Sequence, residues 1–227
     1  MKTTKRNIFL VLFAVLALSV MQAQDKKVEF GFSAGYGYTM PRVKTENNIN
    51  SDINTDNLSG FHVGPHLKLN VEEQFSFQTG LLFNYFSTVT IDRYQQYLKK
   101  AEGTWKQNRT KLMAFDLPFR ATYSAALAED FYFFVFAGPN LNYSVNKVVT
   151  LENYSNRKLL SSTSSENIYQ KPSNYNAFDL QLGAGLGVQW MGVSIRGSYD
   201  WGVLNRTIIE KTALRSNDLK VTLGYTF

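Results

Sequence analysis

Apolar and polar residues alternate along most of this chain. From Leu219 to Phe227 every second residue is apolar, with lysine, threonine and glycine between them. A period of two is typical of a β-strand with one apolar face, whereas an amphipathic helix repeats every three to four residues. The pattern recurs in eight segments, which we predict to be strands: 28–40, 60–71, 75–86, 113–123, 131–145, 177–190, 193–203 and 219–227.

The connections between these segments alternate between long and short. We expect long loops at 42–56, 91–110, 150–174 and 204–216, and short turns at 71–74, 124–130 and 191–192. With an even number of strands, this alternation places every long loop at one end and both termini with the short turns at the other. Outer-membrane barrels have this layout, with the short turns in the periplasm.

The apolar face of the strands could meet lipid or form the core of a soluble sandwich. The polar face is rich in glycine and small residues, which suits the crowded interior of an eight-stranded barrel. Aromatic residues also gather towards strand ends, as in interfacial girdles. The predicted girdle residues are Tyr36, Tyr38, Tyr85, Tyr143, Tyr199 and Trp201 at the long-loop end and Trp190, Tyr225 and Phe227 at the other. We therefore predict an all-β fold, an eight-stranded antiparallel up-and-down transmembrane β-barrel, with a secreted lipocalin-like or sandwich domain as the alternative.

The first residues predict export. A basic segment, a 13-residue apolar run and Ala23 at a cleavage position indicate a signal peptide at 1–23, followed by a barrel domain at 24–227; an uncleaved anchor is the alternative. The chain has no cysteine, which excludes disulfides and lipid attachment through a cysteine. Without the leader's Lys2, Lys5 and Arg6, 21 of the 24 basic residues remain against 18 acidic ones, a net charge of +3. Such a small excess does not indicate a nucleic-acid partner.

The chain stops on an aromatic residue, Phe227. A closed barrel requires its last strand to pair with its first. We expect the terminal alternation and Phe227 also to serve as an assembly signal for the barrel-assembly machinery.

Several stretches together resemble a known family: "GFHVGPHLKLN", "FSFQTGLLFNYFS", "FDLPFRATY", "FYFFVFAGPNLNY", "FDLQLGAGLGVQW", "SIRGSYDWGVLN" and "LKVTLGYTF". They are similar to the outer-membrane β-barrel family of Bacteroidota labelled PorT-like. The resemblance implies an eight-stranded barrel in the cell outer membrane. It supplies no catalytic residues, and the name-giving member belongs to the type IX protein-secretion system.

The inward positions carry five acidic and four basic residues. Such a balance favours a lumen closed by ion pairs over a selective pore, because buried charges need partners. We predict a lumen charge network with Arg120 and Arg196 at its centre. Its other members are Asp116, Asp179, Asp200, Asp218 and Lys220, and Glu29 and Lys68 also point inward.

Two further motifs are typical of a metal site and of a phosphate-binding loop, but their position on strands argues against both. His62 and His66 would lie about 13 Å apart on a strand, too far to share one metal ion, so we expect them to hydrogen-bond to their neighbours in the lumen. The glycines of "GAGLG" (183–187) lie on the inward face of a strand, where close packing explains them without a phosphate. We therefore expect no catalytic, metal or cofactor site. The alternative is a lipid-modifying or proteolytic barrel enzyme that uses His62 with a carboxylate and a rim serine.

The long loops are expected to carry the surface function. Residues 92–111 are basic and could contact lipopolysaccharide phosphates, while the polar, serine-rich 150–174 suggests a loop that is mobile or ordered by a partner rather than a rigid site. We expect a noncatalytic outer-membrane protein that acts as a structural barrel or interaction platform. Its expected partners are lipid, lipopolysaccharide and the barrel-assembly machinery. Secretion-system proteins would be partners of a PorT-type component, the alternative function.

Overall fold

The computed structural model describes residues 28–45 and 56–227; the predicted signal peptide lies outside them. The strands and the helix are β1 (Val28–Thr45), β2 (Leu58–Asn70), β3 (Phe75–Gly80), β4 (Leu82–Thr90), α2 (Arg93–Ala101), β5 (Thr104–Ala128), β6 (Phe131–Ser155), β7 (Lys158–Ser164), β8 (Phe178–Trp190), β9 (Val193–Gly202) and β10 (Thr212–Thr226). Among the described residues, no helix is long and apolar enough to cross a membrane.

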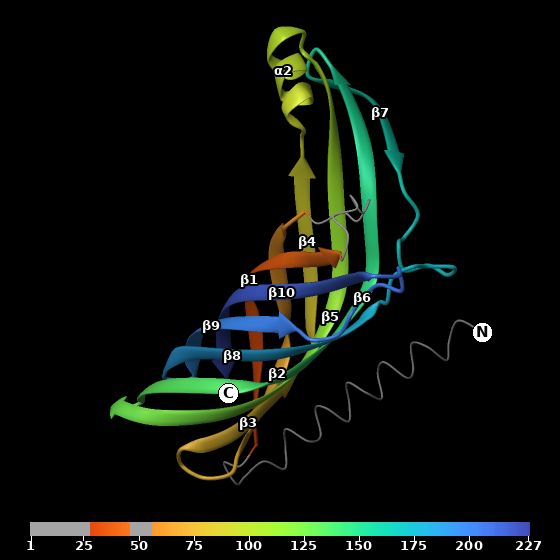
Figure 1. Cartoon of the computed structure of the whole chain (residues 1–227). Helices are drawn as coiled ribbons and strands as arrows, with labels where there is room; N and C mark the ends of the chain where they lie inside the picture. The colour runs from red at the N-terminus through yellow and green to blue at the C-terminus, as the bar shows by residue number, and fades with distance from the viewer. Residues whose placement is uncertain (1–27, 46–55) are drawn as a thin grey trace, which may run out of the picture.

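The strands close into an antiparallel ring, which confirms the predicted barrel (Figure 1). The first and last strands form the seam, from Gly31 opposite Thr226 to Thr45 opposite Thr212. β3 and β4 together form one strand of the ring, interrupted at Leu81, whose amide donates to the Pro65 carbonyl at 3.1 Å. With β3 and β4 counted together and β7 outside the ring, the barrel has the eight strands expected.

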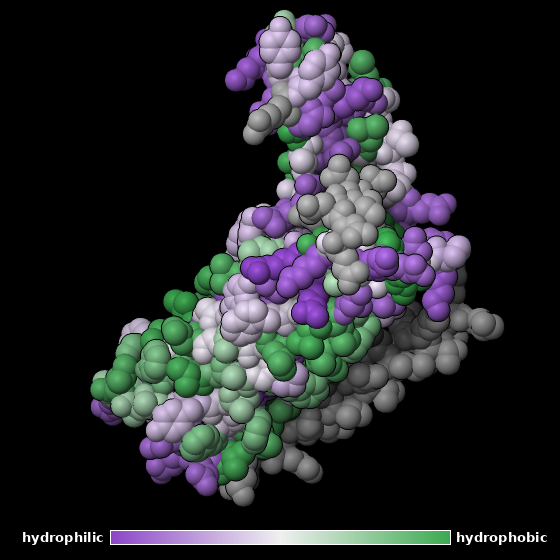
Figure 2. Space-filling model, viewed as in Figure 1, coloured by the Kyte–Doolittle hydropathy of each residue, from purple (hydrophilic) through white to green (hydrophobic). Residues whose placement is uncertain are grey.

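The two faces of the barrel wall differ sharply. Its outward side chains are large and apolar, and Figure 2 shows hydrophobic residues spread over the barrel strands. Its buried inward side chains are mostly polar or charged. This arrangement is the inverse of a soluble protein and is typical of a barrel with lipid outside and a polar lumen.

The short connections follow the prediction. β2 and β3 are joined by 71–74, and β8 and β9 by Met191–Gly192, whose backbone φ angles are positive. The turn between β5 and β6 is tighter than the expected 124–130, because pairing continues to Ala128 opposite Phe131.

The prediction of long loops is wrong for two of the four segments. Residues 91–110 contain α2 and the start of β5, and residues 150–174 contain the end of β6 and all of β7. β5 and β6 stay paired from the barrel to Thr104 opposite Ser155, well beyond the last β6–β8 pair at Tyr143 and Phe178. This projecting hairpin (Thr104–Met113 with Asn146–Ser155) extends about 30 Å beyond the last β6–β8 pair. β4 stays paired with it as far as Thr90 opposite Asn108, β7 lies along its other edge, and α2 lies at its tip (Figure 1).

The other two long connections are shorter than expected. β1 runs on to Thr45, and β10 begins at Thr212. The remainder of the first loop, 46–55, lies outside the described residues.

Candidate functional site

Ion pairs cross the middle of the lumen. Lys220 of β10 lies 2.5 Å from Asp116 of β5 and 3.7 Å from Asp218, while Arg120 pairs with Asp200 of β9. All five side chains are buried. The ion pairs of Asp116 with Lys220 and of Arg120 with Asp200 therefore join strands that are far apart in sequence.

Polar side chains complete the bonding of these carboxylates. Asp116 accepts a hydrogen bond from Asn142 Nδ2 at 2.7 Å. Asp218 accepts bonds from Gln181 Nε2 at 3.0 Å and from the Thr39 hydroxyl. Buried charges with such partners hold a fold in one arrangement, because any shift leaves a charge uncompensated.

Arg196 and Asp179 lie apart from these pairs. Arg196 donates to Gln78 Oε1 at 2.6 Å and to Ser33 Oγ at 3.0 Å, both neutral groups. Asp179 is buried near Arg206 and Asp218, but it makes none of the ion pairs found between described residues. Of the two arginines expected at the centre of the network, only Arg120 is held by a carboxylate.

Little room remains beside the ion pairs. A cavity of about 40 Å³ lies among Arg120, Arg196, Asp200 and Lys220, space for about one or two water molecules. Gly183 faces the Arg120–Asp200 pair, and a Cβ there would overlap the Asp200 carboxylate and lie 2.7 Å from Arg120 Nη1. The glycine of "GAGLG" is thus needed for close packing against an ion pair.

The two histidines contact hydroxyl groups in the lumen. His62 Nε2 lies 2.9 Å from Thr222 Oγ1, and His66 lies 2.8 Å from Ser33 Oγ through Nδ1 and 3.2 Å from Thr226 Oγ1 through Nε2. The expectation of histidines hydrogen-bonded to neighbours agrees with these contacts. The hydroxyl group that contacts His62 belongs to a threonine of β10.

The predicted girdle residues all lie on the outer face of the barrel wall. Tyr36, Phe61 and Tyr85 stand side by side on β1, β2 and β4. Tyr199 packs against Trp201 with ring centroids 4.8 Å apart. The remaining members, exposed on their strands, are Tyr38, Tyr143, Trp190 and Tyr225. Their position at the lipid interface stays a prediction.

Phe227 lies at the seam. Its amide donates to the Phe30 carbonyl at 2.8 Å, and its ring packs against Tyr225. The residue thus extends the β1–β10 pairing by one step; its role as an assembly signal stays a prediction.

A cluster around Glu152 holds the projecting hairpin. Glu152 accepts hydrogen bonds from Gln107 at 2.7 Å, from Arg109 at 2.8 and 3.3 Å, and from the Tyr154 hydroxyl at 3.2 Å. Chiefly because of the Arg109 hydrogen bonds, the pKa of Glu152 is lowered from 4.5 to about 2. Trp105 stacks flat on Tyr154, with centroids 4.7 Å apart and an interplanar angle of 2°. This part of the hairpin is therefore fixed by side-chain contacts as well as by strand pairing.

The tip of the hairpin is α2. Asp92 caps the helix by accepting from the Gln95 amide at 2.7 Å, and Lys99 lies over the Trp105 ring at 4.8 Å. Tyr94 and Tyr97, three residues apart on the helix, are both about two-thirds exposed, at 66% and 64%. Two basic side chains of the segment 92–111, which the sequence predicts as a loop, therefore contact groups within the hairpin. Arg109 forms an ion pair with Glu152, and Lys99 lies over the Trp105 ring.

Lys147 and Arg206 were missed by the sequence reasoning. Met113 pairs with Asn146 but Ala114 pairs with Ser144, so Val145 is an extra residue that shifts the alternation of β6 by one. Lys147 is buried as a result. Arg206 follows β9 outside any strand and is also buried, so strict alternation could find neither residue.

Comparison with known families identifies the fold. Residues 22–206 match the model of the family described as Outer membrane protein beta-barrel domain. The chain belongs to this family. It is an outer-membrane protein, as the sequence predicted. No curated protein sequence matches the chain.

Solved structures with a similar chain course are outer-membrane proteins of low sequence identity. The attachment invasion locus protein Ail of Yersinia pestis is 13% identical, with 88% of this chain and 99% of that chain covered and a TM-score of 0.39. Neisserial surface protein A is 12% identical, with 87% and 97% covered and a TM-score of 0.43. LpxR from Salmonella typhimurium is 8% identical, with 88% and 100% covered and a TM-score of 0.25. The family match, rather than these likenesses, carries the assignment.

Proposed function

We propose that this outer-membrane barrel is a noncatalytic interaction platform whose projecting hairpin meets a protein partner outside the membrane. In outer-membrane barrels the short turns face the periplasm, so the hairpin projects from the cell surface. The observation that carries the proposal is the ordered tip: β5 and β6 remain paired up to α2, and α2 exposes two tyrosines.

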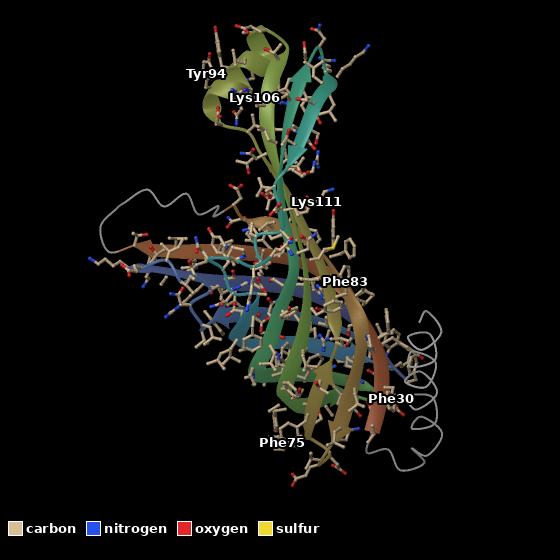
Figure 3. The ribbon with its side chains drawn as sticks, turned by 90° about the vertical axis from the view of Figure 1, so that its right-hand side faces the viewer. Phe30, Phe75, Phe83, Tyr94, Lys106 and Lys111 are labelled. Carbon is tan, nitrogen blue, oxygen red and sulfur yellow. The ribbon has the colours of Figure 1, made fainter. Side chains whose placement is uncertain are left out.

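The tip has the composition of a protein-binding surface. Besides Tyr94 and Tyr97, the adjoining β7 exposes Leu159 and Leu160. Tyr94 and Lys106 lie far above the barrel, at the top of the projection (Figure 3). Exposed tyrosine and leucine side chains in water mark interaction sites, and tyrosine is enriched in protein interfaces.

A cross-linked pull-down tests this proposal. Tagged protein is purified from cross-linked, detergent-solubilised outer membranes, and the co-purifying proteins are identified for the unaltered chain and for Tyr94→Ser/Tyr97→Ser. We expect a set of proteins that is lost in the double variant and kept in Lys100→Ser, which removes an exposed charge from the same helix. An unchanged set in the double variant would contradict the proposal.

The same experiment addresses the PorT-type alternative. A component of a type IX secretion machine would bind its partners through the periplasmic turns, of which 71–74 contains the exposed Glu72 and Glu73. Secretion proteins that are kept in the tyrosine variant but lost in Glu72→Ser/Glu73→Ser would support that alternative and refute the hairpin as the binding site.

A further inference from the structure

A cavity of about 200 Å³ lies in the mouth of the barrel, on the side of the projecting hairpin. Its wall is formed by β5 and β6 just above the ring, by the β6–β8 connection at Tyr169 and by Arg206. Thr39 and Ser216 lie at its lower end, where Thr39 donates to Asp218 of the ion pairs. Because the lumen beneath is filled, the cavity is a blind pocket.

Among the described residues, those of the pocket wall include two cationic side chains and no carboxylate. Arg206 is fixed by neutral groups: it donates to Ser144 Oγ and to the Tyr169 hydroxyl, both at 2.8 Å, and to the Asn176 carbonyl at 3.3 Å. Its guanidinium also lies 5.4 Å from the centre of the Tyr169 ring. The arginine is therefore held in place by neutral groups; buried Asp179 lies near enough to interact with its charge but forms no ion pair with it.

Lys147 stands in the same wall and is also buried. It lies beyond Tyr143, the last residue of β6 that pairs with β8, and so outside the membrane-spanning part. Burial first, and then the charge of Arg206, lowers the pKa of Lys147 from 10.5 to about 8, while Asp56 opposes the shift. None of the ion pairs between described residues includes Lys147 or Arg206. Buried positive charge is costly unless it is compensated, so an anion bound here would stabilise both side chains.

The rest of the pocket combines apolar side chains with hydroxyl groups such as those of Thr39, Ser165 and Ser216. Leu58 and Leu112 line it and form a buried cluster with Phe86, against which Tyr169 packs. Its volume exceeds that of the roughly 150 Å³ apolar cavity that accommodates benzene in an engineered protein. A single ring or short branched chain would therefore fit beside a carboxylate, which suits the planar donors of an arginine.

We propose that this mouth pocket binds a small carboxylate with one apolar ring or short branched chain. The carboxylate contacts Lys147 and Arg206, and the apolar part packs on Leu58 and Leu112. The binding site is separate from the hairpin tip and does not depend on the proposed platform function.

Fluorine NMR on the purified protein in lipid nanodiscs tests this proposal. The probe is fluorobenzoate, and the neutral control of the same shape is fluorobenzamide. We expect the fluorobenzoate signal to broaden and shift saturably with added protein, with dissociation at least tenfold weaker for the amide. Equal binding of both probes would overturn the proposal. Since this comparison uses the unaltered chain, it does not depend on any variant folding.

A matched pair of variants locates the site. Lys147→Gln is expected to weaken fluorobenzoate binding at least tenfold. Lys111→Gln is expected to leave it unchanged, because Lys111 is exposed on the neighbouring strand, opposite Val148. The heat-resistant band on gels shows that each variant is folded. Equal affinity of both folded variants would overturn the assignment to this pocket.

The pH dependence supplies a second readout. Between pH 7 and 9.5 Lys147 loses its proton in the free pocket, whereas the carboxylate of the probe stays ionised. We expect fluorobenzoate affinity to fall at least tenfold over this range, with no such fall in Lys147→Gln. A flat profile for the unaltered protein would contradict the role of Lys147.

Discussion

The same two strands, β5 and β6, form both the barrel wall and the projecting hairpin, and they are built differently in each. In the wall, Phe115, Leu117 and Phe119 face outward while Asp116 and Arg120 are buried. In the hairpin, exposed positions carry residues such as Lys106 and Lys111, and the contacts between strands come from polar and aromatic pairs. Figure 2 shows the corresponding change from a hydrophobic barrel surface to a hydrophilic projection.

The difference follows from the surrounding medium. Where the barrel crosses the membrane, lipid surrounds the apolar side chains of its outer face. Charged side chains there point into the lumen and need partners of opposite charge. Above the membrane the hairpin meets water on its outside, and a single carboxylate, that of the buried Glu152, accepts hydrogen bonds from several donors of the hairpin. The barrel therefore depends on buried ion pairs, whereas the hairpin depends on local side-chain contacts.

The largest effect is expected from breaking an ion pair in the barrel. Arg120→Ala leaves Asp200 buried without its partner, which costs about 3–5 kcal/mol. Urea unfolding in lipid vesicles and the heat-resistant band on gels measure the loss. The double variant Arg120→Ala/Asp200→Ala is expected to regain part of this stability, and Arg196→Ala, whose partners are neutral, to cost less. A destabilisation by Arg196→Ala equal to that by Arg120→Ala would contradict the central place given to the ion pairs.

A smaller effect is expected from crowding the same ion pair. Gly183→Ala pushes a methyl group against Arg120 and Asp200 and is expected to cost about 1–3 kcal/mol. Gly197→Ala is the matched control, because a Cβ at Gly197 meets no atom within 4 Å. The same unfolding measurement compares the two variants, and equal stabilities would show that the lumen is less tightly packed than the structure indicates.

The smallest and most local effect is expected in the hairpin. Glu152→Gln is expected to weaken pairing there by about 1–2 kcal/mol, because charge-assisted hydrogen bonds from Arg109 are lost. Since the pKa of Glu152 in the folded protein lies below that in the unfolded chain, its stabilisation is present above pH 4.5 and is lost as the pH falls towards 2. Hydrogen exchange of hairpin amides at pH 6 and pH 3 measures both effects, and the barrel amides serve as the internal control. Unchanged exchange in the hairpin would contradict the role of Glu152.

The sequence predicted the barrel because the apolar face of each strand repeats with period two, and only local pattern is needed to detect it. The hairpin escaped the prediction because its strands are not apolar on one face: "TWKQNRTK" carries tryptophan but otherwise polar side chains. Its order comes from partners such as Trp105 with Tyr154, which are 49 positions apart in sequence but directly paired. Lys147 escaped because the bulge at Val145 changes the phase of β6, and a bulge leaves no clear sign in one sequence.

Hydrogen exchange of the protein in lipid nanodiscs tests the central claim most directly, namely that the hairpin stands above the membrane as an ordered element. The account predicts that amides of 104–113 and 146–155 are protected well above the level of an unstructured loop. Exchange at the unprotected rate over these residues, with the barrel still protected, would contradict it.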